Sequence, residues 1–173
     1  TSISDAIIEN DHPIILYENN SQMHLMRYDS SWSLPVSLSK PSTSDTYNFR
    51  LFTRADGNYD IFYLQGLPEI NYKYNIHNLR ISVDFGAGQS TILSETREIM
   101  DKDTNEYIRL SDVVRNTDGT YHIFAIRRDI EDGSTYERMY HMLYDNGKTY
   151  FFARVSPLVM NVDYLVIGTY QSG

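Results

Sequence analysis

The chain carries the stretch FRLFTRADGNYDIFY at Phe49–Tyr63 and a second version of it, LSDVVRNTDGTYHIFA, at Leu110–Ala125. Each version has a strand-like run, an Asp-Gly pair and a second run in which aromatic and polar residues alternate. Asp-Gly between two such runs is a strong hairpin signal, because a tight turn needs positive φ and glycine adopts it without steric cost. The versions match from the Asp-Gly pair onward, and the alignment predicts one inserted residue before this pair in the second version. The chain therefore repeats a β unit.

Composition and charge restrict the possible fold classes and the possible partners. The 173 residues suffice for one well-cored domain, and 15 tyrosines favour half-buried sheet surfaces over helices. A net charge of −8 predicts no nucleic-acid partner, since an acidic surface repels phosphate backbones. The absence of cysteine excludes disulfides and thiolate chemistry. No apolar run approaches the roughly 20 residues of a membrane-spanning helix, so we expect no membrane span.

Strand signals continue along the rest of the chain, and no helix longer than a few turns is needed. Strands are expected at 12–18, 22–29, 72–85, 136–144, 149–155 and 164–170, and the runs at 22–29 and 72–85 alternate. Residues 1–11 lack alternation, so we expect a helical turn or a linker there. Pro35 demotes the run 32–38 to an edge strand, because proline cannot donate to the ladder. A short helix or a loop is expected at Glu95–Met100. The fold class is all-β.

The strand runs group into three units of about 55–60 residues, a period typical of propellers and other repeat architectures. The run 23–29 lines up with 139–145 as an outer strand, and the first unit lacks an innermost strand. We predict one β domain over 1–173, with units at about 12–45, 46–106 and 107–162 and a closing strand at 163–171. Three four-stranded antiparallel blades are fewer than the ~4–8 of a complete ring. We therefore expect a partial ring, or one completed by another chain; a β-sandwich is the alternative.

The hairpin sequences resemble the blades of the sialidase-like β-propellers, the group with BNR-type repeats. The resemblance rests on ADGNYDIFY at 55–63 and TDGTYHIF at 117–124, which follow a D-G-x-x-x-I-F/V pattern. Sialidases, polysaccharide lyases and hydrolases, and phage glycan depolymerases belong to this group. The full Asp-box of the group, S-x-D-x-G-x-T-W, is absent, and its nearest approaches are Ser82–Gly86 and Tyr144–Tyr150.

The resemblance implies glycan recognition, with a carbohydrate as partner, by a module that is secreted or displayed on a virion or cell surface. The first alternative is a glycoside hydrolase or lyase acting on acidic polysaccharide, and the second is a structural or assembly module. The enzyme needs an acid and two arginines in one pocket, whereas recognition needs an aromatic-lined pocket. Assembly predicts a large apolar open edge. We also expect a homo-oligomer or a longer chain, and no cofactor.

Asp112 is the candidate acid or base of the enzyme alternative, with Tyr63 and Tyr121 assisting. It falls in a predicted innermost strand, where the first version has the apolar Leu51 or Phe52. A carboxylate there would face a central channel, and perturbed inner carboxylates mark functional sites. The structural alternative is a solvated residue at the start of a strand, or a turn cap.

Arginines and tyrosines are the candidates for holding a sugar. Guanidinium groups bind carboxylates in a bidentate manner, which acidic sugars require, and aromatic rings stack on sugar rings. The predicted substrate-binding residues are Arg50, Arg54, Arg115, Arg127, Tyr59 and Tyr136. Ion pairs are the alternative for the arginines, and packing between sheets is the alternative for the tyrosines. We expect the only tryptophan, Trp32, to pack.

No metal site is predicted. The five histidines lack ligand spacing such as H-x-x-x-H. The residues Asp101, Asp103 and Asn105 have the oxygen ligands of a calcium loop, but Glu106 stands where such a loop needs glycine.

Overall fold

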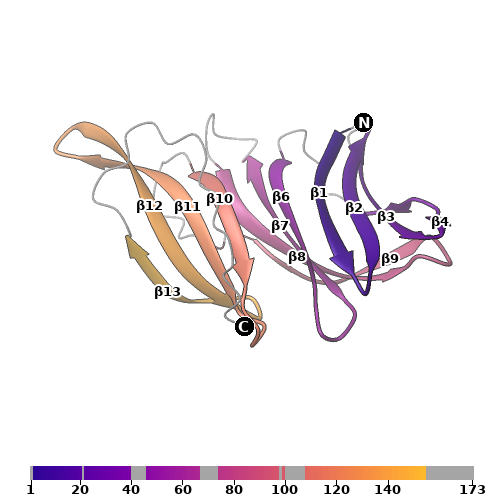
Figure 1. The fold of residues 1–173 in the computed structure, drawn as a ribbon. Helices are drawn as coiled ribbons and strands as arrows, with labels where there is room; N and C mark the ends of the chain where they lie inside the picture. Colours follow the sequence, from indigo (N-terminus) through magenta and orange to yellow (C-terminus); the bar gives the residue numbers. More distant parts are fainter. Residues whose placement is uncertain are drawn as a thin grey trace. The chain divides into compact units, whose positions relative to one another are not determined.

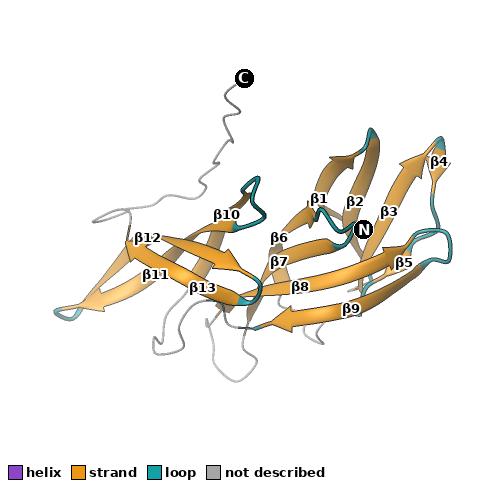
Figure 2. Cartoon of the chain, turned by 90° about the horizontal axis from the view of Figure 1, so that it is seen from below, coloured by secondary structure: helices purple, strands orange, loops and turns teal. Residues whose placement is uncertain are grey.

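The computed structural model describes residues 2–20, 22–39, 46–66, 74–97, 99 and 108–154. In this part of the chain every regular element is a strand, and the strands form three antiparallel sheets (Figures 1 and 2). The prediction of an all-β fold with four-stranded antiparallel sheets is confirmed. The sheets are open, and no closed ring is present in the described residues. No described helix has the length and apolar character needed to cross a membrane.

The first sheet has the strand order β1 (Ser2–Glu9), β2 (His12–Asn19), β3 (Gln22–Asp29) and β4 (Ser31–Trp32), with β5 (Val36–Ser37) also paired to β3. Strand β1 overturns the expectation of a helical turn or linker at residues 1–11. A bulge between Ile3 and Asp5 shifts the register there, and a bulge breaks the alternation that marks a strand. The first sheet therefore has an innermost strand of its own. Pro35 separates β4 from β5, so the predicted single edge strand is two short ones.

The second sheet has the order β6 (Thr46–Thr53), β7 (Tyr59–Gly66), β8 (Tyr74–Asp84) and β9 (Gln89–Thr96). Strand β9 includes Glu95 and Thr96, which excludes a helix at these two residues. The third sheet has the order β10 (Ile108–Arg115), β11 (Tyr121–Glu131), β12 (Ser134–Asp145) and β13 (Lys148–Arg154). The predicted closing strand at 163–171 and the loop with Asp101, Asp103 and Asn105 lie outside the described residues, and the predicted unit boundaries stay a prediction.

The two Asp-Gly hairpins have the same backbone. The Arg54 N–H donates to the Asn58 carbonyl at 2.8 Å, and the Asn116 N–H donates to the Thr120 carbonyl at 2.8 Å. Gly57 has a φ of 77° and Gly119 a φ of 92°, the left-handed region that glycine adopts most readily.

The strand pairing places Asp112 opposite Phe124 and Arg50 opposite Phe62, the matching residue of the first hairpin. No residue is inserted before the second turn, so the predicted alignment was wrong at this point. Asp112 is equivalent to Arg50, not to Leu51 or Phe52.

The predicted alignment of the outer-strand run 23–29 with 139–145 stays a prediction.

The chain divides into two compact units, Thr1–Gln65 with His77–Thr96 and Gly66–Ile76 with Arg97–Gly173. In the first unit the core lies between the first and second sheets. Its buried residues are Ile14, Leu16, Met23, Leu25, Val36, Leu38, Phe49, Leu51, Tyr59, Ile61, Tyr63, Leu79 and Ile81. Alternation along β2 and β3 directs one set of side chains into this core and the other set to the opposite face, which we call the outer face of the first sheet.

Candidate interaction surface

The outer face of the first sheet carries apolar side chains on β1, β2, β3 and β4. Residues that pair directly share a face, and Ile3 pairs with Tyr17, Ile15 with Met26 and Tyr28 with Trp32. Ile8, which pairs with Pro13, lies on the same face. The exposed fractions are 76% for Ile8, 68% for Ile3, 47% for Trp32 and 40% for Tyr28. Four large apolar side chains of one sheet face are therefore open.

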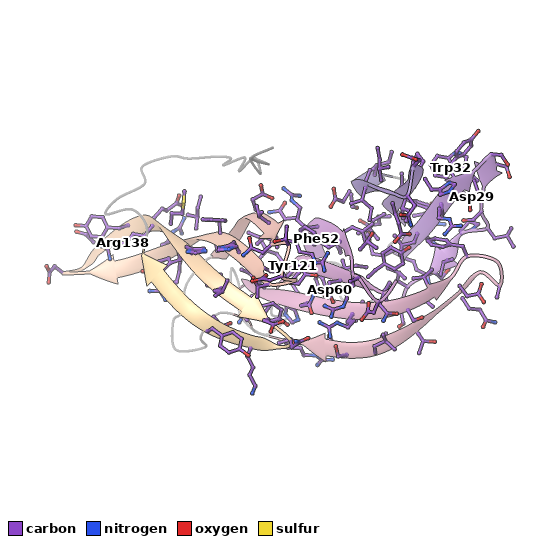
Figure 3. All side chains as sticks on the ribbon, turned by 60° about the horizontal axis from the view of Figure 1, so that its bottom comes forward. Asp29, Trp32, Phe52, Asp60, Tyr121 and Arg138 are labelled. Carbon is purple, nitrogen blue, oxygen red and sulfur yellow. The ribbon has the colours of Figure 1, made fainter. Side chains whose placement is uncertain are left out.

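Trp32 packs only in part, contrary to the expectation from the sequence. Its ring meets that of Tyr28 edge-on, with the centroids 5.4 Å apart and the planes at 65°. Almost half of the side chain remains exposed. Figure 3 shows Trp32 and Asp29 at the same end of the first sheet. The one tryptophan of the chain is thus a component of the outer face.

The charged residues of the first sheet all belong to the opposite face. Alternation from the buried Ile14, Leu16 and Leu25 places them on the core side of the sheet. They are Asp5, Glu9, Glu18, Arg27 and Asp29. An antiparallel sheet with one solvated side normally shows the reverse pattern, with apolar residues inward and polar residues outward.

Two of these acids connect the first sheet to the second. Asp5 accepts the Leu51 N–H at 2.7 Å through Oδ2 and the Ala6 N–H at 2.9 Å through Oδ1. Glu9 Oε2 accepts the hydroxyl of Tyr59 at 2.8 Å. Burial, and then the hydrogen bond to Glu9 and its charge, raise the pKa of Tyr59 above its ordinary value. Tyr59, a predicted sugar-binding residue, is 3% exposed and bonds within the protein.

Arg27 and Asp29 form a cluster with His12 at the end of β3. Arg27 Nε donates to Asp29 Oδ2 at 2.8 Å, and His12 Nδ1 lies 2.5 Å from Asp29 Oδ1. The Arg27 guanidinium also lies over the ring of Phe85, 5.4 Å from its centroid. These groups engage one another on the core side, and no charge reaches the outer face at the described strand positions.

Arg54 binds a buried carboxylate in the second sheet. Asp60 is 0% exposed and accepts Arg54 Nη1 at 2.9 Å and Arg80 Nε at 3.0 Å. In the ladder Asp60 pairs with Phe52, whose ring meets Phe62 edge-on at 6.0 Å (Figure 3). Burial alone would lower the pKa of Arg54, but the hydrogen bonds and charges of Asp60 and Asp56 raise it above the ordinary value.

Tyr63 and Arg50 also have internal partners. Tyr63 is 2% exposed, and its ring stacks between those of Phe49 and His77 at 5.7 and 5.3 Å. Arg50 Nη1 donates to the carbonyl of Phe49 at 3.0 Å. Packing is the role that the geometry gives Tyr63.

In the third sheet, Asp112 is separated from the arginines that the enzyme alternative requires. Its Oδ1 accepts the Val113 N–H at 2.9 Å, and the residue is half-buried. Arg115 is three residues from Asp112 on β10, and Arg127 is three residues from its cross-strand neighbour Phe124 on β11. Odd spacing in a strand means opposite faces, so this sheet does not bring Asp112 together with Arg115 or Arg127.

The other predicted residues of the third sheet make contacts within it. Arg127 Nη2 donates to the Tyr140 hydroxyl at 3.0 Å and lies over its ring. The Arg138 guanidinium is 5.3 Å from the ring centroid of Tyr136. Tyr121 is 1% exposed and packs against Tyr144.

The sequence contained a signal for the outer face that was missed. HPIILYE at 12–18 is apolar at two adjacent pairs of positions, Ile14–Ile15 and Leu16–Tyr17. A strand that is apolar on both faces is typical of a sheet covered on both sides. The pattern therefore predicts that both faces of this strand are buried against other elements.

Among the described residues, no group of three or more His, Cys, Asp or Glu residues is placed to hold a metal ion. Comparisons with protein-family models, with curated proteins and with solved structures found no match for the chain. Function is therefore inferred from the geometry of this chain alone.

Proposed function

We propose that the chain is a protein-docking β module that packs the outer face of its first sheet against an apolar surface of a partner. The observation that carries this proposal is the distribution of charge. Every charged residue in the strands of the first sheet is on the core side, while Ile3, Ile8, Tyr28 and Trp32 are exposed on the other. Contiguous exposed apolar surface of this kind marks interaction sites.

A protein surface suits this face better than a small ligand does. Small-ligand sites are concave and combine apolar walls with a few well-placed polar groups. Ile8, Ile15 and Met26 supply no polar group, and the acids and Arg27, the one arginine of these strands, lie on the core side. Apolar sheet faces pack against one another about 10 Å apart, as antiparallel sheets do in sandwiches and between propeller blades.

The contacts between the first two sheets support a propeller-like stack as the finer architecture. The first strands of the two sheets, β1 and β6, contact each other, and so do β5 and β9 at the other side. Blades of a propeller pack in this way, with inner strands beside inner strands. A sheet face that is exposed in such a stack can receive a further sheet.

Dye binding tests the docking proposal, because Trp32 is the only tryptophan and reports on the face itself. We expect anilinonaphthalene sulfonate to bind the dilute chain and to be excited by energy transfer from Trp32. The Ile8→Asp variant should lose this transfer, since a carboxylate enters the apolar patch. Leu93→Asp is the matched control, because Leu93 is 50% exposed on β9, away from the outer face. Transfer that is absent, or that survives Ile8→Asp unchanged, contradicts the proposal.

Glycan recognition is the second candidate, and the exposed pair of Trp32 and Tyr28 favours it. Aromatic rings open to solvent stack on the apolar faces of sugars. Titration with neutral and acidic oligosaccharides, followed by the emission of Trp32, tests it. A shift that saturates and that Tyr28→Ala weakens would support recognition on a secreted or surface-displayed module. An emission that no oligosaccharide changes would remove this candidate.

A further inference from the structure

We propose that the partner of the outer face is a second copy of this chain, so that two copies pack their first sheets against each other in a two-fold symmetric dimer. This inference rests on the docking function proposed above and names its partner. In a two-fold contact the same surface meets itself, and such dimers are the commonest protein oligomers.

The charge distribution of the chain allows two copies to meet on this face. Each copy carries a net charge of −8, so two copies repel each other wherever acidic surfaces meet. Charges about 10 Å apart, the spacing of packed sheets, still interact at physiological salt, where the Debye length is about 8 Å. Apart from His24, the outer face has no acidic or basic residue among its described strand positions, because Asp5, Glu9, Glu18, Arg27 and Asp29 all lie on the core side. It is a surface on which two acidic copies can meet without opposing carboxylates.

The single titratable ring of the outer face is itself engaged within the sheet. His24 stacks on Tyr17 with the ring centroids 5.3 Å apart and an interplanar angle of 22°. Its Nδ1 lies 3.2 Å from Ser37 Oγ. These contacts hold the two rings against each other, and Ile3, Ile8 and Trp32 are more exposed apolar residues of the same face.

The other exposed apolar residues of the first unit do not form a comparable surface. Ile92 and Leu93 are 44% and 50% exposed, but Ile92 pairs with the buried Ile81 and Leu93 lies in the bulge of β9. Leu34 lies in the segment between β4 and β5. Only the outer face combines several exposed apolar side chains in one direction among the described residues of this unit.

Sedimentation equilibrium on the whole chain tests this inference. We expect the mass to rise from one chain to two with increasing concentration. Ile8→Asp should weaken the dimer roughly tenfold or more, because association would bury unpaired carboxylates. Ile8 is 76% exposed, so the variant should fold normally, and circular dichroism verifies this. Leu93→Asp should leave the dimer unchanged. A dimer that tolerates Ile8→Asp overturns the inference.

A monomer at every concentration also overturns the second copy as partner. In that case the dye experiment separates the two proposals. Energy transfer from Trp32 that Ile8→Asp abolishes would leave the docking function standing with a different partner. A monomer without such transfer would remove both the dimer and the docking function.

Discussion

The two Asp-Gly hairpins share a backbone and differ in chemistry at one equivalent pair of residues. The residue before each turn bonds to the second residue of the following strand. In the first hairpin Arg54 binds Asp60, and in the second Asn116 Nδ2 lies 2.8 Å from Nε2 of His122. The same geometry therefore holds an ion pair in one sheet and an amide–imidazole pair in the other.

The two pairs also differ in burial and in the side chains around them. Asp60 is fully buried and has a second guanidinium, that of Arg80. His122 is half-buried and lies against His141, with Nδ1 and Nε2 2.7 Å apart and the rings stacked at 4.9 Å. A repeated turn thus fixes where two side chains meet and leaves their charge free to vary. A repeat in the sequence predicts geometry and does not predict chemistry.

Removing the buried carboxylate should have the largest effect. Asp60→Asn leaves the guanidinium groups of Arg54 and Arg80 without their buried counter-charge, which costs about 3–5 kcal/mol of unfolding free energy. His122→Asn at the equivalent position removes only a half-buried neutral contact and should cost about 1 kcal/mol. Urea unfolding of the two variants measures both. Equal losses would show that the two positions are energetically alike.

The turn glycines should give smaller and matched losses. Gly57→Ala and Gly119→Ala place a side chain at φ of 77° and 92°, which costs about 1–2 kcal/mol each. A Cβ at Gly57 meets nothing within 4 Å, and at Gly119 it meets only Arg115 Nη2 at 3.7 Å. Backbone strain alone therefore sets both values. Urea midpoints that differ widely between the two variants would contradict the conclusion that the two turns have the same backbone.

Lowering the pH should reduce the stability of the sheet that contains the second hairpin, and this effect should be smaller still. Burial, and then the charge of His122, lower the pKa of His141. The unfolded chain, with a histidine pKa near 6.5, binds more protons in this range, so stability falls as the pH drops from about 6.5 through the folded pKa. Two titratable residues lie on the same sheet face as His141. They are His122 on β11 and Asp112 on β10. His141→Gln should flatten the dependence in urea unfolding from pH 7 to 5. An unchanged slope would assign it to other groups.

The sequence predicted the strands better than it predicted the contacts between residues that are distant in sequence. Strong alternation and the Asp-Gly pairs located both hairpins, because these are local signals. Strand β1 was missed because the bulge at Asp5 disrupts the period. The pairing of Asp60 with Arg80 joins β7 to β8 at a distance in sequence that no local pattern specifies. Which sheet faces are covered is likewise a property of packing, and so the exposure of Trp32 was not predicted.

Acrylamide quenching of Trp32, measured across a concentration series together with the mass, tests the central claim that the outer face is covered on assembly. The account predicts that quenching decreases as the mass rises from one chain to two, and that Ile8→Asp keeps the quenching of the dilute chain throughout. Association without any change in the quenching of Trp32 would place the contact elsewhere and contradict the account.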